Sequence, residues 1–372
     1  MTTRVPVNEP VLDGNERAYL NECIDTGWIS SEGPFIGRFE SEFAHRIGRQ
    51  HGIAVSNGSV ALDAAVGALE IGEGDEVIMP TFTIISCAAP VVRAGAVPVL
   101  IDSDAGTWNM DASAIESRIT SRTRAIMPVH IYGLPVDMDP VLKIAERHNL
   151  AVIEDAAEMI GQTYRGRPCG SMGTISTFSF YPNKHVTTGE GGMVLTDDDA
   201  LADRCRSLRN LAMKPPRRFV HDELGWNFRM TNMQAAVGVA QLERLDEFVA
   251  RKHHLFQRYT SLLSDIDSIE LPVGETAYAR NINWVYGVVI RDDHALDADA
   301  AISRLGELGI GTRPFFWPMH EQPVFRKMGL FEGESYPVAE RIARRGFYLP
   351  SGLALTDEQI DAVSHAMHEL FA

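Results

Sequence analysis

Short apolar segments rich in β-branched residues alternate with helical patterns from about residue 50 to about residue 200 of this chain. Several of the segments are apolar on both faces, as strands are when helices cover both sides of a parallel sheet. This alternation predicts an α/β domain with a mostly parallel central sheet. The expected strands are residues 52–55, 76–79, 97–101, 125–131, 151–153, 174–180 and 192–195, and the expected helices between them are residues 60–69, 84–94, 112–119 and 140–147.

A long helical pattern over residues 231–254 follows, and it predicts a link between two domains. We expect a large domain over residues 1–248, with the N-terminal segment included, and a smaller α+β domain over residues 249–372. A chain of 372 residues is long enough for both. The patterns that indicate the smaller domain are a strand over 284–290 and helices over 298–308 and 357–370.

The net charge of the chain limits the classes of molecule that it is expected to bind. The formal net charge is -16, whereas sequence-independent nucleic-acid binding needs clustered lysine and arginine. We therefore expect no nucleic-acid partner. A local basic pocket for a phosphorylated small molecule is still compatible with an acidic protein. The basic stretch at residues 214–218 is equally well explained as part of such a pocket or as a solvated turn around its two prolines.

The cysteines and the apolar runs predict the cellular setting. The four cysteines, at positions 23, 87, 169 and 205, include no C-x-x-C pair, so neither a metal site nor a redox motif is indicated. Scattered thiols in a long chain are typical of a reducing compartment. The N-terminus lacks the apolar core of a signal peptide, and no apolar run approaches the roughly 20 residues that span a bilayer. We expect a cytoplasmic protein with no membrane partner.

A lysine stands directly after one of the expected strands. Lys184 ends the sequence SFYPNK and precedes the glycine-rich turn at residues 189–192. Ligands bind at strand ends in open α/β sheets. A lysine desolvated there has a lowered pKa, which frees its amine to form a Schiff base. A lysine in a surface loop is the alternative.

Two other strand ends carry residues suited to a cofactor. A carboxylate at Asp155 could hold a ring nitrogen in its protonated form, or it could cap the next helix. After strand 52–55, Asn57 is a plausible N-cap, and the backbone N–H groups of Gly58 and Ser59 would then offer an anion site. Ser179 could add a hydroxyl group. A capped helix without a ligand is the alternative.

The order of these elements, a phosphate turn followed by Asp155 and then Lys184, resembles the DegT/DnrJ/StrS family of sugar aminotransferases. The resemblance extends over nearly the whole chain. It implies the fold type I architecture of aspartate aminotransferase, pyridoxal 5′-phosphate (PLP) as cofactor and a homodimer with shared active sites. Its further matches are residues 26–30 (TGWIS), 128–133 (PVHIYG), 225–231 (GWNFRMT), 313–314 (RP) and 318–320 (PMH).

The resemblance also implies cofactor contacts. Lys184 is expected to form the Schiff base and to move the proton between cofactor and substrate carbons, while Asp155 pairs with the pyridine nitrogen. The implied phosphate contacts are Gly58, Ser59 and Ser179, with Asn227 reaching the neighbouring subunit's site, and Glu158 is expected near the ring. One departure concerns Ile84, which replaces an aromatic residue of many relatives. Ile84 can cover the ring but cannot stack on it, and Phe82 is a candidate core residue.

The implied substrate is a nucleotide-linked keto sugar, with glutamate as amino donor. The implied substrate contacts are Trp28, Ser30, Tyr181, Arg313 and His320. A related dehydratase group has histidine in place of the lysine, so Lys184 favours amino transfer over deoxygenation.

Within the family, residues 12–17, 125–130 and 181–184 resemble members that aminate C4 of GDP-4-keto-6-deoxy-D-mannose, as in O-antigen (lipopolysaccharide) biosynthesis. Three alternatives stay open. The substrate could be a UDP- or dTDP-linked 3- or 4-keto sugar. The chain could be a PLP-binding regulatory protein without turnover. It could also be a fold type I lyase or decarboxylase.

Overall fold

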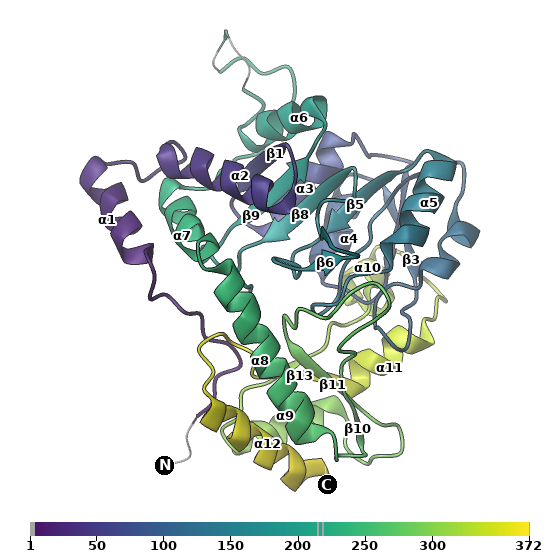
Figure 1. Cartoon of the computed structure of the whole chain (residues 1–372). Coiled ribbons are helices and arrows are strands. Elements are labelled where there is room, and N and C mark those ends of the chain that lie inside the picture. The colour runs from purple at the N-terminus through teal and green to yellow at the C-terminus, as the bar shows by residue number, and fades with distance from the viewer. Residues whose placement is uncertain (1–3, 214–215, 218, 372) are drawn as a thin grey trace.

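The computed structural model describes residues 4–213, 216–217 and 219–371 (Figure 1). A seven-stranded sheet, in the order β1-β9-β8-β5-β4-β2-β3, forms the centre of its larger part. Lys214, Pro215 and Arg218 of the predicted basic stretch lie outside the described residues. The strands are β1 (His51–Val55), β2 (Glu76–Pro80), β3 (Val97–Ile101), β4 (Thr123–Ile126), β5 (Ala151–Asp155), β8 (Ile175–Ser179) and β9 (Gly192–Thr196).

The mostly parallel sheet that the sequence predicts is confirmed. Strands β3, β2, β4, β5 and β8 are parallel neighbours, whereas β9 pairs antiparallel with both β8 and β1. Parallel neighbours need a crossover connection, usually a helix, and residues 180–191 between β8 and β9 contain none. Strand β4 ends at Ile126 rather than at the predicted residue 131, shortly before Pro128, whose nitrogen cannot donate to a sheet.

Helices cover both faces of this sheet (Figure 1). Alternate residues of β1 enter two separate cores, Ile53 and Val55 on one face and Ala54 on the other. The first core takes side chains from α3 (Gly58–Ala68), α4 (Ile85–Arg93) and α6 (Asp199–Arg209). The second core takes them from α1 (Glu16–Thr26), α2 (Pro34–Ile47), α5 (Met138–His148) and α7 (Asn232–Leu242).

Two helix predictions are wrong in detail. Residues 112–119 form two short 3₁₀ turns, Ala112–Ala114 and Glu116–Arg118, instead of one α-helix. The predicted helix over residues 231–254 is divided into α7 and α8 (Leu245–Leu263). The interruption lies at Glu243 and Arg244, whose side chains bind the N-terminal residues Asn15 and Asp13.

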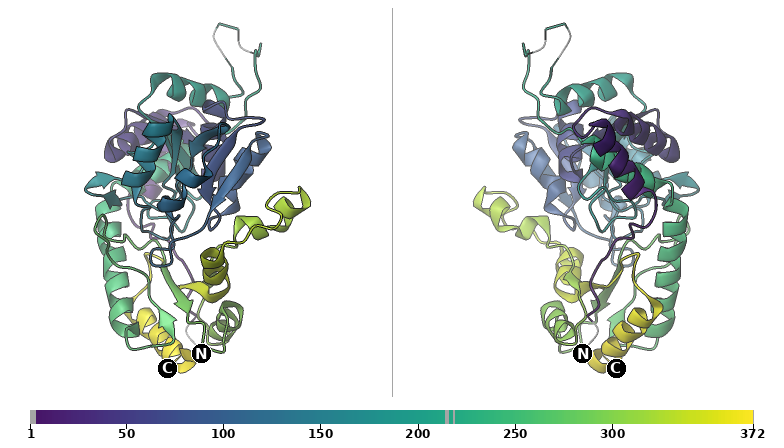
Figure 2. Two further views of the ribbon diagram at one scale, coloured as in Figure 1. Left: turned by 90° about the vertical axis from the view of Figure 1, so that its right-hand side faces the viewer. Right: turned by 90° about the vertical axis from the view of Figure 1, so that its left-hand side faces the viewer.

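A four-stranded antiparallel sheet, in the order β10-β11-β13-β12, organises the C-terminal part. The N-terminal segment runs down beside it (Figure 2). There Val5 pairs with Ile310, and the backbone of Ser351 donates to Val7. The division of the chain at residue 248 stays a prediction. The elements here are β10 (Ile269–Glu270), β11 (Tyr286–Ile290), α9 (Ala298–Glu307), β12 (Arg313–Pro314), α10 (Pro323–Lys327), α11 (Pro337–Arg345), β13 (Gly346–Leu349) and α12 (Asp357–Phe371).

Two further expectations concern cysteines and membranes. All four cysteines are buried and none forms a disulfide. Among the described residues, no helix combines the length and the apolar character needed to cross a bilayer.

Candidate active site

A pocket of about 750 Å³ opens where three strands of the large sheet end. The ends of β1, β5 and β8 bring Asn57, Asp155 and Ser179 to its wall, and the C-terminal part closes it with Trp284 and Tyr348. This is the place and the size expected of a small-molecule site in an α/β fold.

Eight of the cofactor and substrate contacts expected from the sequence line this pocket, together with the expected N-cap Asn57. They come from segments more than 120 residues apart, which the sheet order brings together. The eight are Gly58, Ser59, Ile84, Asp155, Glu158, Ser179, Tyr181 and Lys184.

Lys184 extends into the pocket from a turn after β8. Its backbone N–H donates to the Tyr181 carbonyl at 2.9 Å, and its Nζ lies 3.6 Å above the centre of the Trp284 ring. Nζ is also 3.6 Å from Oε1 of Glu158. Burial lowers the pKa of Lys184, while the carboxylates of Glu158 and Asp155 oppose this shift. A larger fraction of neutral amine is therefore present than on an exposed lysine, as a nucleophile requires.

Glu158 is the carboxylate that pairs with this amine. Its Oε2 accepts a hydrogen bond from the backbone N–H of Tyr132 at 2.7 Å. Burial raises the pKa of Glu158 to about 7, and the charge of Lys184 partly offsets the rise. The two groups therefore both titrate closer to neutrality than they do in water, and the charge of each affects the pKa of the other.

Replacing Glu158 with glutamine is expected to lower the pKa of Lys184 further, because the carboxylate favours the ammonium form. The midpoint for acetylation of Lys184 in the cofactor-free protein, followed by mass spectrometry, should fall by roughly one pH unit. Glu190→Gln is the matched control, because that exposed residue lines the same pocket. An unchanged or higher midpoint in Glu158→Gln would contradict the assignment.

Asp155 ends β5 with a carboxylate that is 3% exposed. Its Oδ1 accepts from the Ala157 N–H at 3.0 Å, and its Oδ2 accepts from the Cys87 thiol at 3.2 Å. Burial raises the pKa of Asp155, and these two donors together with Lys184 oppose the rise. The residues after Asp155 form turns rather than a helix, so the helix-cap alternative does not apply.

The N-terminus of α3 supplies a third wall. Asn57 caps the helix, its Oδ1 accepting from the Val60 N–H at 3.0 Å. The first N–H groups of a helix have no acceptor within it, so Gly58 and Ser59 present free donors suited to an anion. A Cβ atom on Gly58 would lie 2.7 Å from Cβ of Ser179. Glycine is therefore needed for α3 to begin against the end of β8.

Replacing Gly58 with alanine is expected to push α3 away from Ser179 and to weaken anion binding at the helix N-terminus. We expect a loss of about 1–3 kcal/mol in unfolding free energy, the usual cost of overpacking, and weaker cofactor binding. Urea denaturation and cofactor titration measure the two effects. Gly37→Ala in α2 is the matched control, because its Cβ would meet no atom within 4 Å. Equal behaviour of the two variants would refute the steric explanation.

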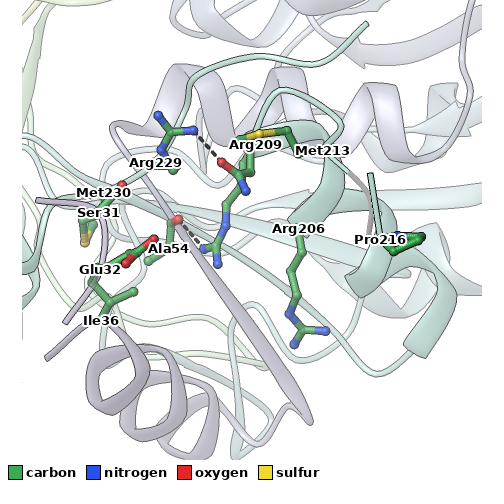
Figure 3. Close-up of a pocket in the computed structure, with 11 residues that line it drawn as sticks. Ser31, Glu32, Ile36, Ala54, Arg206, Arg209, Met213, Pro216, Arg229 and Met230 are labelled. Atoms are coloured by element: carbon green, nitrogen blue, oxygen red, sulfur yellow. Dashed lines mark hydrogen bonds between the residues drawn. The ribbon is translucent and has the colours of Figure 1, made fainter. Parts of the chain in front are cut away.

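A second hollow of about 650 Å³ contains three arginines, Arg206, Arg209 and Arg229 (Figure 3). All three are held by the protein itself, Arg206 by an ion pair with Asp203 at 3.0 Å. Arg209 donates to the Ala54 carbonyl at 2.7 Å, and Arg229 donates to Asn210.

Three of the predicted residues, Asn227, Trp28 and Ser30, are absent from the lining of the Lys184 pocket. Asn227 pairs with Asn210, which lines the hollow. The Trp28 carbonyl accepts from the side-chain amide of Asn232 at 2.8 Å, and the Ser30 carbonyl accepts from the backbone N–H of Asn232 at 2.6 Å. Within one chain these three residues do not join Lys184, and their roles stay predictions.

Arg313 and His320 also lie outside the lining of the Lys184 pocket. Arg313 pairs in the small sheet with Tyr348, which does line it. Protein groups occupy both ring nitrogens of His320: Nδ1 is 2.8 Å from Oγ1 of Thr81, and Nε2 is 3.1 Å from Oε1 of Glu340. The predicted substrate contacts of both residues stay predictions.

His320 also belongs to the one group of potential metal ligands found among the described residues. Its ligand atoms and those of Glu321 and Glu340 lie within 4.8 Å of one another. Glu340 contacts His320, and Oε1 of Glu321 pairs with Arg344, while Oε2 of Glu321 is buried without a hydrogen-bond partner among the described residues. These contacts form a polar network within the protein.

Several pocket residues were not selected from the sequence, among them Thr83, Thr177 and Trp284. Thr177 lines the pocket, and its Oγ1 is buried without a hydrogen-bond partner in the described part of the chain. Strand alternation could have revealed Thr177, since it is two residues before Ser179 on β8. The predicted Ile84 lines the pocket with 46% of its surface exposed, and Phe82 is fully buried in the core.

Known proteins resemble the chain over its whole length. The family model of the DegT/DnrJ/EryC1/StrS aminotransferases matches residues 10–368. The GDP-perosamine synthase of Caulobacter vibrioides is 46% identical over 99% of this chain and 98% of its own length, and that of Escherichia coli O157:H7 is 41% identical over 99% of both. The crystal structure of S. venezuelae DesV in complex with a ketimine intermediate superposes with a TM-score of 0.91, at 35% identity, covering 99% of this chain and 98% of DesV.

Proposed function

Because the chain belongs to the DegT/DnrJ/EryC1/StrS aminotransferase family, we propose that it transfers an amino group from L-glutamate to GDP-4-keto-6-deoxy-D-mannose and so forms GDP-perosamine. The observation that carries the proposed chemistry is one pocket that combines the Lys184 amine, the Asp155 carboxylate and the N-terminus of α3. The choice of sugar is supported by the full-length similarity to two GDP-perosamine synthases.

The residues present fit PLP as cofactor. The free N–H groups at Gly58 and Ser59 suit a phosphate, and the buried Asp155 carboxylate suits a protonated ring nitrogen. The unpartnered hydroxyl of Thr177 offers a further polar contact inside the pocket. Lys184 supplies a partly neutral amine for covalent attachment.

PLP, when bound, supplies an aldehyde that reacts with amines and a ring that accepts the electron pair left when a neighbouring carbon loses its proton. Once the amino donor has replaced Lys184 on the cofactor, the freed Nζ would act as general base and then as general acid. It would move a proton from the donor carbon to the cofactor carbon in the first half-reaction, and from the cofactor carbon to the sugar carbon in the second. Glu158 lies 3.6 Å away and stabilises the protonated state of this amine. The Trp284 ring shields the amine from water on one side.

We propose a homodimer as the functional unit, with Asn227 reaching the phosphate site of the neighbouring subunit. Exposed apolar side chains close to Asn227 in the sequence support this, since such patches are typical of interaction surfaces. Leu224 is 93% exposed and Trp226 39% exposed. Synthesis in the cytoplasm, for the O-antigen of lipopolysaccharide, completes the proposal, and the four free thiols agree with it.

The cofactor spectrum of the purified holoprotein tests both halves of the reaction. L-Glutamate is expected to bleach the absorbance near ~400 nm, D-glutamate is expected not to, and GDP-4-keto-6-deoxy-D-mannose should then restore the band. Recovery with UDP- or dTDP-linked keto sugars alone would overturn the substrate assignment. A band that glutamate never bleaches would overturn amino transfer and favour a regulatory protein, while release of carbon dioxide without bleaching would favour a lyase.

A further inference from the structure

Cys87 is a buried thiol in direct contact with the carboxylate of Asp155. It lies on α4 and is fully buried, with its Sγ donating to Oδ2 of Asp155 at 3.2 Å. Oγ1 of Thr83, one turn earlier, lies 3.2 Å from the same sulfur atom. The thiol proton is directed to the carboxylate, so the threonine hydroxyl is free to donate to sulfur. A chain of two hydrogen bonds therefore leads from the pocket wall to Asp155.

We propose that Cys87 is a positioning residue, whose thiol holds the Asp155 carboxylate in its orientation and in its charged form. This inference rests on the proposed function, in which that carboxylate serves the cofactor ring. Among the described residues, two donors reach the Asp155 carboxylate, one on each oxygen: the Cys87 thiol and the backbone N–H of Ala157. Of the two, only the thiol can be removed by substitution.

The contact is not explained by packing alone. Cys205 belongs to the same hydrophobic core, is equally buried and makes only a long 3.9 Å contact with the Ala64 carbonyl. Burial and the Asp155 charge raise the pKa of the Cys87 thiol well above its usual range, so the thiol stays protonated and can donate.

Three other ionisable groups affect the pKa of Asp155, namely Lys184, His130 and Glu158. Lys184 and His130 favour its ionised form, whereas Glu158 opposes it through like charge. These three groups are unchanged in any variant of Cys87. A difference between such variants therefore reports on the thiol.

The test is the affinity of the cofactor-free protein for PLP, measured by titration across pH for the wild type and for Cys87→Ala, Cys87→Ser and Cys205→Ala. Cys87→Ala and Cys205→Ala remove the same atom from the same core, but only the first removes a donor from Asp155. We expect the Kd to rise roughly five- to tenfold in Cys87→Ala, which lies within the range for one ordinary hydrogen bond. Serine should restore most of the affinity, and Cys205→Ala should bind like the wild type.

The pH dependence gives a readout that a loss of packing would not change. The carboxylate is charged above its pKa and neutral below it, so affinity falls as the pH falls. Without the thiol the pKa of Asp155 is higher, and the fall in Cys87→Ala should begin at higher pH than in Cys205→Ala. Equal affinities and equal pH profiles in the two alanine variants would overturn the role of Cys87. Failure of the wild type itself to bind PLP would instead overturn the proposed cofactor.

Discussion

Replacing Lys184 with alanine is expected to reduce kcat by at least about a thousandfold. The substitution removes a general base, which alone contributes roughly 10²–10⁴-fold in enzymes, and it also removes the covalent attachment of the cofactor. The side chain is nearly enclosed, with 10% exposure, and among the described residues no other lysine lines the pocket. We therefore expect no other lysine to replace it. Steady-state kinetics with glutamate and the keto sugar measure the loss.

Two further variants show whether the loss of activity comes from losing the neutral amine, from losing a positive charge or from misfolding. Lys184→Arg keeps a cation but cannot supply a neutral amine, because guanidinium does not lose its proton in proteins. We expect it to be as inactive as Lys184→Ala. Lys143→Ala, an exposed position on α5, should keep full activity. Activity in Lys184→Arg close to that of the wild type would contradict a role for the neutral amine.

Replacing Asp155 with asparagine is expected to lower kcat/KM by roughly two to three orders of magnitude. The change keeps the shape of the side chain and removes its charge, and losing one partner of a buried charged pair costs about 2–5 kcal/mol. The loss should appear in both half-reactions, because both need the ring as an electron acceptor. Stopped-flow absorbance with glutamate alone and then with the keto sugar separates them.

The control for this variant is Asp198→Asn, which makes the same change at the exposed N-cap of α6. It should lose only a little stability, because asparagine is also a good N-cap, and its activity should match the wild type. If Asp155→Asn kept wild-type rates in both half-reactions, the ring nitrogen would not depend on this carboxylate.

Much of this architecture could be predicted because its patterns are local. The apolar runs of β1, β2 and β3 match the observed strands to within one residue, since a buried strand must be apolar along its length. The reversal of β9 and the division between α7 and α8 depend on contacts between distant segments. Glu243 binds Asn15, for example, and no local pattern contains that pairing.

The residues of the candidate active site could also be predicted only where a local pattern marks them. Lys184, Asp155 and Gly58 could be selected because each stands at the end of a strand or shortly after it, and strand ends gather at one edge of a sheet. Trp284 and Cys87 could not be selected in this way. Trp284 reaches the lysine from the C-terminal part of the chain, and Cys87 reaches Asp155 from the buried face of α4. Contacts of this kind follow from tertiary packing, which a sequence pattern does not encode.

The central claim is that one lysine, Lys184, binds the cofactor covalently, and reductive labelling tests it most directly. The holoprotein is treated with borohydride, which makes a lysine–cofactor bond permanent, and is then digested and mapped by mass spectrometry. We predict a single modified peptide that carries the cofactor on Lys184. Modification of a different lysine, or of none, would contradict the account.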